Sequence, residues 1–173
     1  GLPSDAIYNV FRDSRGQLWF ASHWMGLTRF DGKEYKTFNK EADGLVGDNI
    51  HYIAEDREGQ IWIGTHTGIS RFDGENFSNF AGQDALHGGE NQGILMDRSG
   101  KMWFASDRGL SCYYGSGFKY FKRDDGLSSN NTNVLFEDSE GQIWAGGDGL
   151  SVYDGDKFTV FTPTAETLSN IQG

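Results

Sequence analysis

A tryptophan recurs along the chain at steps of 43, 41 and 41 residues. Each copy closes the same phrase, in which an aspartate is followed three residues later by glycine and six residues later by tryptophan. A period of about 40 to 45 residues indicates a repeat architecture, and it constrains the fold more strongly than composition does. The four copies of the phrase are Asp13–Trp19, Asp56–Trp62, Asp97–Trp103 and Asp138–Trp144.

Each repeat is predicted to hold four short strands. In the first repeat we expect strands over residues 7–12, 17–21, 27–30 and 34–38. The Asp-x-x-Gly turn would reverse the chain between the first two strands, and Asp31-Gly32 is a hairpin signal between the last two. Four antiparallel strands in such a unit are typical of a propeller blade, and one blade alone cannot bury both of its faces.

The sequence therefore predicts an all-β β-propeller domain made of four consecutive four-stranded antiparallel blades. Their expected bounds are 1–43, 44–85, 86–125 and 126–166, and residues 167–173 would open a fifth repeat. The repeated tryptophans are expected at equivalent buried places between sheets. We favour a segment of a larger propeller; half of an eight-bladed ring made by two chains and a closed four-bladed ring stay open. Uncovered blade faces would drive self-association or pairing with further blades.

Composition excludes several classes of function. The net charge of −10 disfavours nucleic-acid binding. The segment has no apolar run near the roughly 18 residues of a membrane span. Cys112 is the single cysteine, so an internal disulfide and a cysteine-based metal site are excluded. Phosphate-loop, nucleophile-elbow and His-Glu-x-x-His motifs are absent from the sequence, so we expect no enzyme and no cofactor.

The repeat phrase carries a resemblance to a known family. Gly-Leu-Pro-Ser, then a strand, then Asp-x-x-Gly-x-Leu-Trp-Phe-Ala-Ser and Gly-Leu-Thr-Arg-Phe-Asp-Gly resemble the two-component regulator propeller repeat over essentially the whole chain. That family forms the extracytoplasmic sensor portion of bacterial hybrid histidine kinases and related surface proteins. The resemblance implies a periplasmic or extracellular module that binds a small molecule or oligosaccharide and feeds a two-component signalling system.

Two alternatives to a sensor stay open. A structural or assembly module would use its exposed blade faces to pair with other chains. A streptogramin lyase is a distant propeller relative, which implies an enzymatic alternative, although its catalytic positions are not matched in this sequence. We rank the lyase last.

The turns differ between the two ends of the predicted blades. The turns between first and second strands, and between third and fourth strands, are nearly identical from repeat to repeat, which indicates a folding role. The turns between second and third strands vary, as do the connections between blades. Variation confined to one end of a repeat scaffold is what a recognition surface would show.

The candidate ligand-binding residues lie on this variable end. Trp24 is the only tryptophan outside the repeat phase, and it could stack on a sugar ring, cover a loop or contact a partner chain. The histidines are too far apart in sequence for a local metal motif, so we expect no metal site. The candidates are His23, Trp24, His66, Asp107 and Arg108 in the turns, and His51, Glu90, Asn91 and Gln92 where the first strands begin near the central opening.

Overall fold

The structure is a computed structural model that describes residues 2, 6–81 and 91–162. It contains four four-stranded antiparallel sheets, and each sheet keeps the order of the chain. The first sheet holds β1 (Ile7–Arg12), β2 (Leu18–Ser22), β3 (Leu27–Phe30) and β4 (Tyr35–Phe38). The second holds β5 (Ile50–Glu55), β6 (Ile61–Thr65), β7 (Gly68–Phe72) and β8 (Phe77–Phe80). The all-β prediction of four propeller blades is confirmed.

The last two sheets repeat this pattern. The third holds β9 (Asn91–Met96), β10 (Met102–Ser106), β11 (Gly109–Tyr113) and β12 (Phe118–Phe121). The fourth holds β13 (Thr132–Glu137), β14 (Ile143–Gly147), β15 (Leu150–Tyr153) and β16 (Phe158–Val160). Among the described residues, two short helical turns lie in the connections between blades, α1 (Lys40–Asp43) and η2 (Arg123–Asp125), and neither was expected from the sequence.

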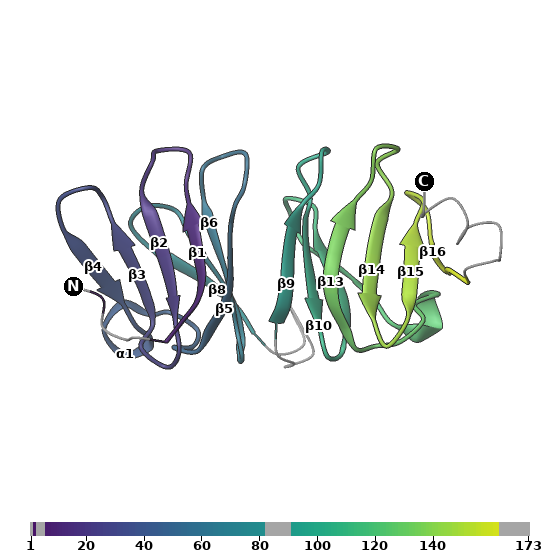
Figure 1. The fold of residues 1–173 in the computed structure, drawn as a ribbon, viewed down its shortest axis with the longest axis horizontal. Coiled ribbons are helices and arrows are strands. Elements are labelled where there is room, and N and C mark those ends of the chain that lie inside the picture. Colours follow the sequence, from purple (N-terminus) through teal and green to yellow (C-terminus); the bar gives the residue numbers. More distant parts are fainter. Residues whose placement is uncertain (1, 3–5, 82–90, 163–173) are drawn as a thin grey trace, which may run out of the picture.

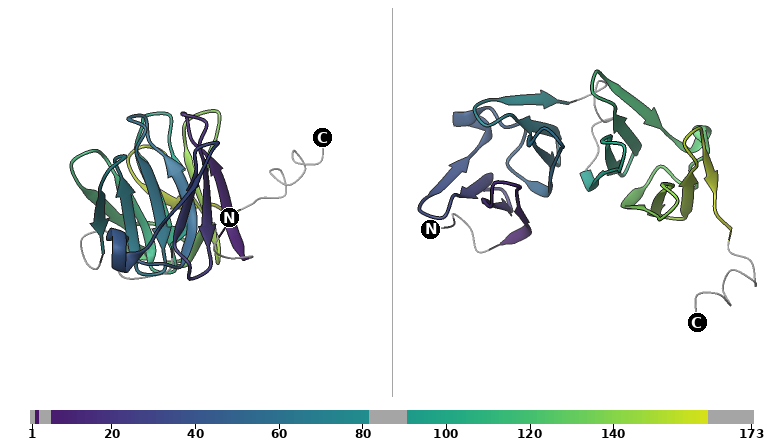
Figure 2. Two further views of the ribbon diagram at one scale, coloured as in Figure 1. Left: turned by 90° about the vertical axis from the view of Figure 1, so that its left-hand side faces the viewer. Right: turned by 90° about the horizontal axis from the view of Figure 1, so that it is seen from above.

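The blades stand side by side along an arc (Figures 1 and 2). The first strand of each blade lies on the inner side of the arc, and the last strand lies on the outer side (Figure 2). The β1–β2 and β3–β4 turns lie at the upper end in Figure 1, and the β2–β3 turn lies at the lower end. We refer to these as the upper end and the lower end of the blades.

The recurring aspartate fixes both the upper turn and the tryptophan. In the first blade, the Asp13 Oδ1 accepts the backbone N–H groups of Arg15 and Gln17 at 3.0 and 2.7 Å. Its Oδ2 accepts the Trp19 indole N–H at 2.8 Å. The same aspartate–indole bond is made by Asp56 and Trp62, by Asp97 and Trp103, and by Asp138 and Trp144, at 2.7, 2.8 and 2.7 Å. The indole bond explains why aspartate and tryptophan recur six residues apart.

Each of the first three tryptophans packs against the next blade. The ring centroids lie 5.8 Å apart for Trp19 and Phe72, 5.3 Å for Trp62 and Phe104, and 5.2 Å for Trp103 and Tyr153. Trp19, Trp62 and Trp103 are fully buried. Three hydrophobic clusters therefore join four blades.

Trp144 does not share this environment. It is only half-buried, and the ring contact recorded for it is with Phe161 of its own blade at 5.1 Å. The expectation of four equivalent buried tryptophans is wrong for the fourth copy, because no described blade lies on that side.

The two terminal blades leave apolar sheet faces uncovered. Val10 and Tyr35 lie on the face of the first blade that points away from Trp19, and they are 58% and 44% exposed. Val134 and Phe136 lie on the same face as Trp144 and are 63% and 61% exposed. The first and fourth blades stand at opposite ends of the arc, so the described residues do not close a four-bladed ring (Figure 2).

The difference between the tryptophans gives a direct test of the packing. Trp62→Ala removes a fully buried ring between two blades and should lower the free energy of unfolding by about 3–5 kcal/mol. Trp144→Ala in the same 173-residue chain should cost clearly less, because that ring is half exposed. Urea unfolding of both variants measures the difference. Equal losses would contradict this account of the interblade layers.

Acid should destabilise the fold through the turn aspartates. Burial alone would raise the pKa of Asp97, but hydrogen bonds from Ser99, the Trp103 indole and the turn amides outweigh it and hold that pKa below 3.8. Hydrogen bonds to the charged form also lower the pKa values of Asp31, Asp73, Asp138 and Asp154. The stability that depressed pKa values contribute is present above the unfolded value and is lost as pH falls through the folded value.

We therefore expect the urea midpoint to fall steadily from about pH 5 downward, through 3.8 and below it. Asp97→Asn supplies the control, since an amide keeps an acceptor in the turn but does not titrate. This variant should be less stable at neutral pH and lose less stability on acidification. An unchanged acid dependence in Asp97→Asn would mean that the Asp97 carboxyl contributes nothing to it.

Candidate functional site

The lower turn of the first blade is longer than its counterparts. Three residues separate Ser22 from Gly26, whereas two residues fill the equivalent places in the second and third blades. The turn is held by hydrogen bonds from the Ser22 N–H to the Gly26 carbonyl at 3.3 Å and from the Gly26 N–H to the Asp48 carbonyl at 3.0 Å. The extra length presents Trp24 at the surface.

Trp24 has an unusual backbone as well as an exposed ring. Its φ is +59°, and it is the non-glycine residue with positive φ among those the structure describes. A bulky residue in this left-handed region costs on the order of 1–2 kcal/mol. The side chain is 57% exposed. Strain of this kind persists where the surroundings or a function maintain it, and burial in the core does not account for this tryptophan.

The structure brings four of the predicted site residues together, joined by a fifth aromatic. We call Tyr8, His23, Trp24, His51 and His66 the aromatic cluster. Trp24 meets His66 of the second blade edge-on, with ring centroids 4.8 Å apart, and lies 6.0 Å from His23. Tyr8 lies 5.2 Å from His23 and 5.9 Å from His51. The cluster therefore bridges the first two blades.

All four inner strands contain a bulge. β1, β5, β9 and β13 each shift register at the same point, just after their first residue. The extra residues are Tyr8, His51, Gln92 and Asn133. A bulge inserts an unpaired residue and re-aims its side chain. Sequence reasoning missed Tyr8 and Asn133, since a bulge changes register without leaving a composition signal.

A shallow hollow of about 450 Å³ lies beside the cluster, lined by Tyr8, Asn9, His51 and Tyr52. Two polar atoms near it are buried without a hydrogen-bond partner among the described residues, the Asn9 Oδ1 and the His66 Nδ1. Buried polar atoms are costly when unsatisfied, and hydroxyl groups of a ligand can donate to the Asn9 Oδ1 and either donate to or accept from the His66 Nδ1.

The remaining predicted site residues are distributed differently. Asp107 and Arg108 are exposed on the β10–β11 turn, at the same end but one blade further along. Asn91 and Gln92 belong to β9, at the inner side of the third blade. Glu90 lies outside the described residues.

Three other observations bear on what the chain can do. Within residues 2, 6–81 and 91–162, no group of three or more His, Cys, Asp or Glu side chains is placed to hold a metal ion. Burial raises the pKa of the Cys112 thiol to about 12, so this thiol stays protonated at neutral pH. The described part of the chain also contains no helix with the length and apolar character needed to cross a membrane.

Comparison with known proteins shows which repeat family these segments match. The two-component regulator propeller family matches residues 1–24, 44–67 and 126–149, which are the opening segments of the first, second and fourth repeats. Three of the four repeats are therefore two-component regulator propeller repeats. No curated protein matches the chain with statistical significance.

Solved structures share the propeller fold at low identity. One is described as the extracellular domain of a hybrid two component system from B. thetaiotaomicron; it is 19% identical with a TM-score of 0.66, and the match covers 92% of this chain and 29% of that one. Virginiamycin B lyase from Staphylococcus aureus is 11% identical with a TM-score of 0.73, covering 94% and 57%. PorZ, a surface component of the type-IX secretion system of Porphyromonas gingivalis, is 15% identical with a TM-score of 0.66, covering 91% and 26%.

These likenesses concern the fold alone. The regulator propeller chain spans less than a third of the B. thetaiotaomicron and P. gingivalis proteins, at 29% and 26% of their lengths. The three neighbours are described with different roles, so the role of this chain has to be argued from its own side chains.

Proposed function

We propose that this regulator propeller is an extracytoplasmic ligand-binding module that feeds a two-component signalling system. The family and the extracellular domain among its structural neighbours support the setting. The observation that carries the binding role is Trp24, an exposed ring held in a left-handed backbone beside two histidines.

The cluster favours a carbohydrate ligand. An exposed indole offers a flat apolar face for a sugar ring, while the imidazoles and Tyr8 offer polar edges around it. The Asn9 Oδ1 is an acceptor and the His66 Nδ1 is a donor or an acceptor, and sugar hydroxyls can satisfy both atoms. Binding rather than catalysis is proposed, and a lyase activity ranks last because the lyases share only the fold with this chain.

Trp24 variants test this proposal. Trp24→Gly should remove the stacking contribution, on the order of 1–3 kcal/mol by analogy with bases stacked on aromatic rings. The melting temperature should stay unchanged or rise, because glycine adopts positive φ without strain. A glycan array with wild type and variant, together with melting curves, measures both effects.

Tyr35→Ala is the matched control, since Tyr35 is also an exposed aromatic of the first blade but lies on its outermost strand. Glycan binding should survive this change. Trp24 would be a structural residue, and the proposal would fail, if Trp24→Gly lowered the melting temperature as much as Trp62→Ala does.

A structural or assembly role is the second candidate, and the uncovered terminal faces favour it. In the first three blades, the face that carries the repeated tryptophan packs against the opposite face of the next blade. The face around Trp144 is equivalent to the first kind of face, and the face around Val10 and Tyr35 is equivalent to the second. Sheet faces of this kind are association sites.

The isolated 173-residue chain should therefore associate as its concentration rises. Trp144→Glu places a charge on the C-terminal face and should shift the chain toward monomer in sedimentation experiments. A wild-type chain that stays monomeric at high concentration would argue against the assembly role. It would leave the ligand-binding proposal intact.

A further inference from the structure

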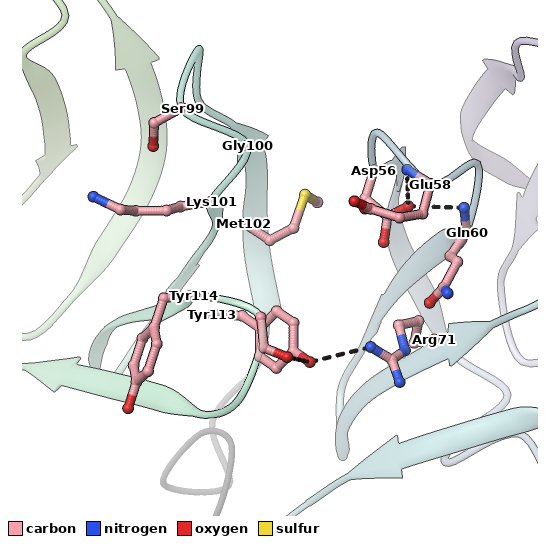
Figure 3. A pocket seen from close by; sticks show the side chains of 11 residues that line it. Asp56, Glu58, Gln60, Arg71, Ser99, Gly100, Lys101, Met102, Tyr113 and Tyr114 are labelled. Carbon is pink, nitrogen blue, oxygen red and sulfur yellow. Dashed lines mark hydrogen bonds between the residues drawn. The ribbon is translucent and has the colours of Figure 1, made fainter.

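The clefts between neighbouring blades differ sharply at the upper end. Between the second and third blades lies a cavity of about 430 Å³, at the end opposite the aromatic cluster (Figure 3). Its walls include Glu58, Gln60 and Arg71 of the second blade and Met102 and Tyr113 of the third. The equivalent space between the first and second blades measures about 10 Å³.

A substitution in the upper turn contributes to this difference. Arg15 follows the aspartate of the first upper turn by two residues, and its side chain lies across the cleft against the second blade. Its Nη atoms lie 3.7 and 3.9 Å from the places where β-carbons would stand on Gly59 and Gly74. The equivalent residue of the second blade is Glu58, which is exposed. The cleft between the second and third blades therefore stays open.

Arg71 and Lys101 are the cations that line the open cleft, and the Arg71 guanidinium lies against three aromatic rings. It lies 5.4 Å from the Trp62 ring centroid and 5.8 Å from those of Phe80 and Tyr113. Its Nη1 donates a hydrogen bond to the Tyr113 hydroxyl at 3.2 Å (Figure 3). A guanidinium held by rings keeps its in-plane N–H donors on the edge, which is the geometry that binds a carboxylate through two parallel hydrogen bonds.

Gln60 adds an acceptor to the same wall. Its side chain extends toward Arg71 in Figure 3, and its Oε1 is buried with no hydrogen-bond partner among the described residues. A buried carboxamide oxygen in this state is satisfied by a ligand that donates a hydrogen bond. The cavity volume lies within the roughly 300–1,000 Å³ range of small-molecule sites.

We propose that this cleft binds a small organic carboxylate that also carries a hydroxyl or ammonium donor. Arg71 pairs with the carboxylate, and Gln60 accepts from the neighbouring donor. Sugar acids and amino acids both have this chemistry. The site is separate from the aromatic cluster and does not depend on the proposed function there.

Methionine methyl NMR can follow the two sites separately. The chain has three methionines, Met25, Met96 and Met102. Met102 lies at the wall of the cleft, and Met25 follows Trp24 in the lower turn of the first blade. Titration of the 173-residue chain with D-galacturonate should shift the Met102 methyl signal, whether or not Met25 also responds to the sugar ring. A shift of Met25 alone would place the acid at the aromatic cluster and overturn the proposal.

Two further probes test whether the carboxylate is needed and whether the ligand is a sugar acid or an amino acid. D-galactose has the same ring without the carboxylate and should leave Met102 unshifted at the same concentration. L-serine tests the amino-acid source, and a Met102 shift by either acid supports the site. The proposal fails if neither acid shifts Met102, or if galactose shifts it as strongly as galacturonate does.

Arg71→Gln and Arg29→Gln form a matched pair. Arg29 stacks in the same way over Trp19 and Phe38, at 5.8 Å from each centroid, but borders the closed cleft. Arg71→Gln should weaken binding of the acid about 10- to 100-fold, as expected for a lost charge-assisted pair. Arg29→Gln should leave binding unchanged while causing a similar change in melting temperature. Equal binding by wild type and Arg71→Gln would rule out the assigned carboxylate contact.

Discussion

The hydrogen bond from the tryptophan indole to the aspartate of its own turn sets the geometry on which the rest of the fold depends. A buried indole N–H needs an acceptor, and here the acceptor is supplied locally, so the ring is oriented before any neighbouring blade is present. The ring then presents a fixed apolar surface to the next sheet. One aspartate therefore links a local turn to a contact about 50 residues away, as between Trp19 and Phe72. Because stability in a repeat protein is a sum of units and nearest-neighbour interfaces, this device has to recur in every unit.

Because of this requirement the upper turns are more alike than the lower turns, but some residues of the upper turns still differ between blades. The aspartate and glycine of the upper turn are held by hydrogen bonding and backbone conformation, whereas the side chains of the two residues between them differ from repeat to repeat. Arg15 and Glu58 occupy the same one of these places, and the exchange of a long cation for an exposed acid separates a closed cleft from an open one. In the lower turns of the second and third blades, the Thr65 and Ser106 hydroxyls donate to the carbonyls of Gly68 and Gly109. The first blade has one more residue in this turn, and Trp24 is exposed there. Recognition surfaces on this scaffold can therefore arise by turn length at one end and by side-chain exchange at the other.

The fold followed from the sequence because its determinants are local. Asp-x-x-Gly turns and Asp-Gly hairpins fix where strands begin and end, and the strand predicted over residues 7–12 has those bounds in the structure. Trp144 was wrongly expected to be buried, since burial depends on a neighbour that sequence periodicity alone does not supply. The sequence predicted that Trp24 and His66 lie at the same end of the propeller, but not that their rings are in contact. Tyr8 was not predicted because it is the extra residue of a bulge, and the strand register is not visible in the sequence. Arg71 was not predicted because its accessibility to a ligand depends on the width of the cleft between two blades.

Both candidate sites lie across boundaries between blades, and this position has a thermodynamic consequence. Trp24 and His66 belong to the first and second blades, while Arg71 and Tyr113 belong to the second and third. A ligand that contacts two blades binds the packed arrangement and not the separated one, so it adds RT ln(1 + [L]/Kd) to the free energy of that interface, about 2.7 kcal/mol at a hundredfold excess over Kd. In a quasi-one-dimensional array the added free energy is local to one boundary. Occupation of either site would therefore stabilise one interface between blades rather than the whole molecule. An interface whose stability depends on ligand is an element through which a propeller can transmit ligand binding to an attached domain.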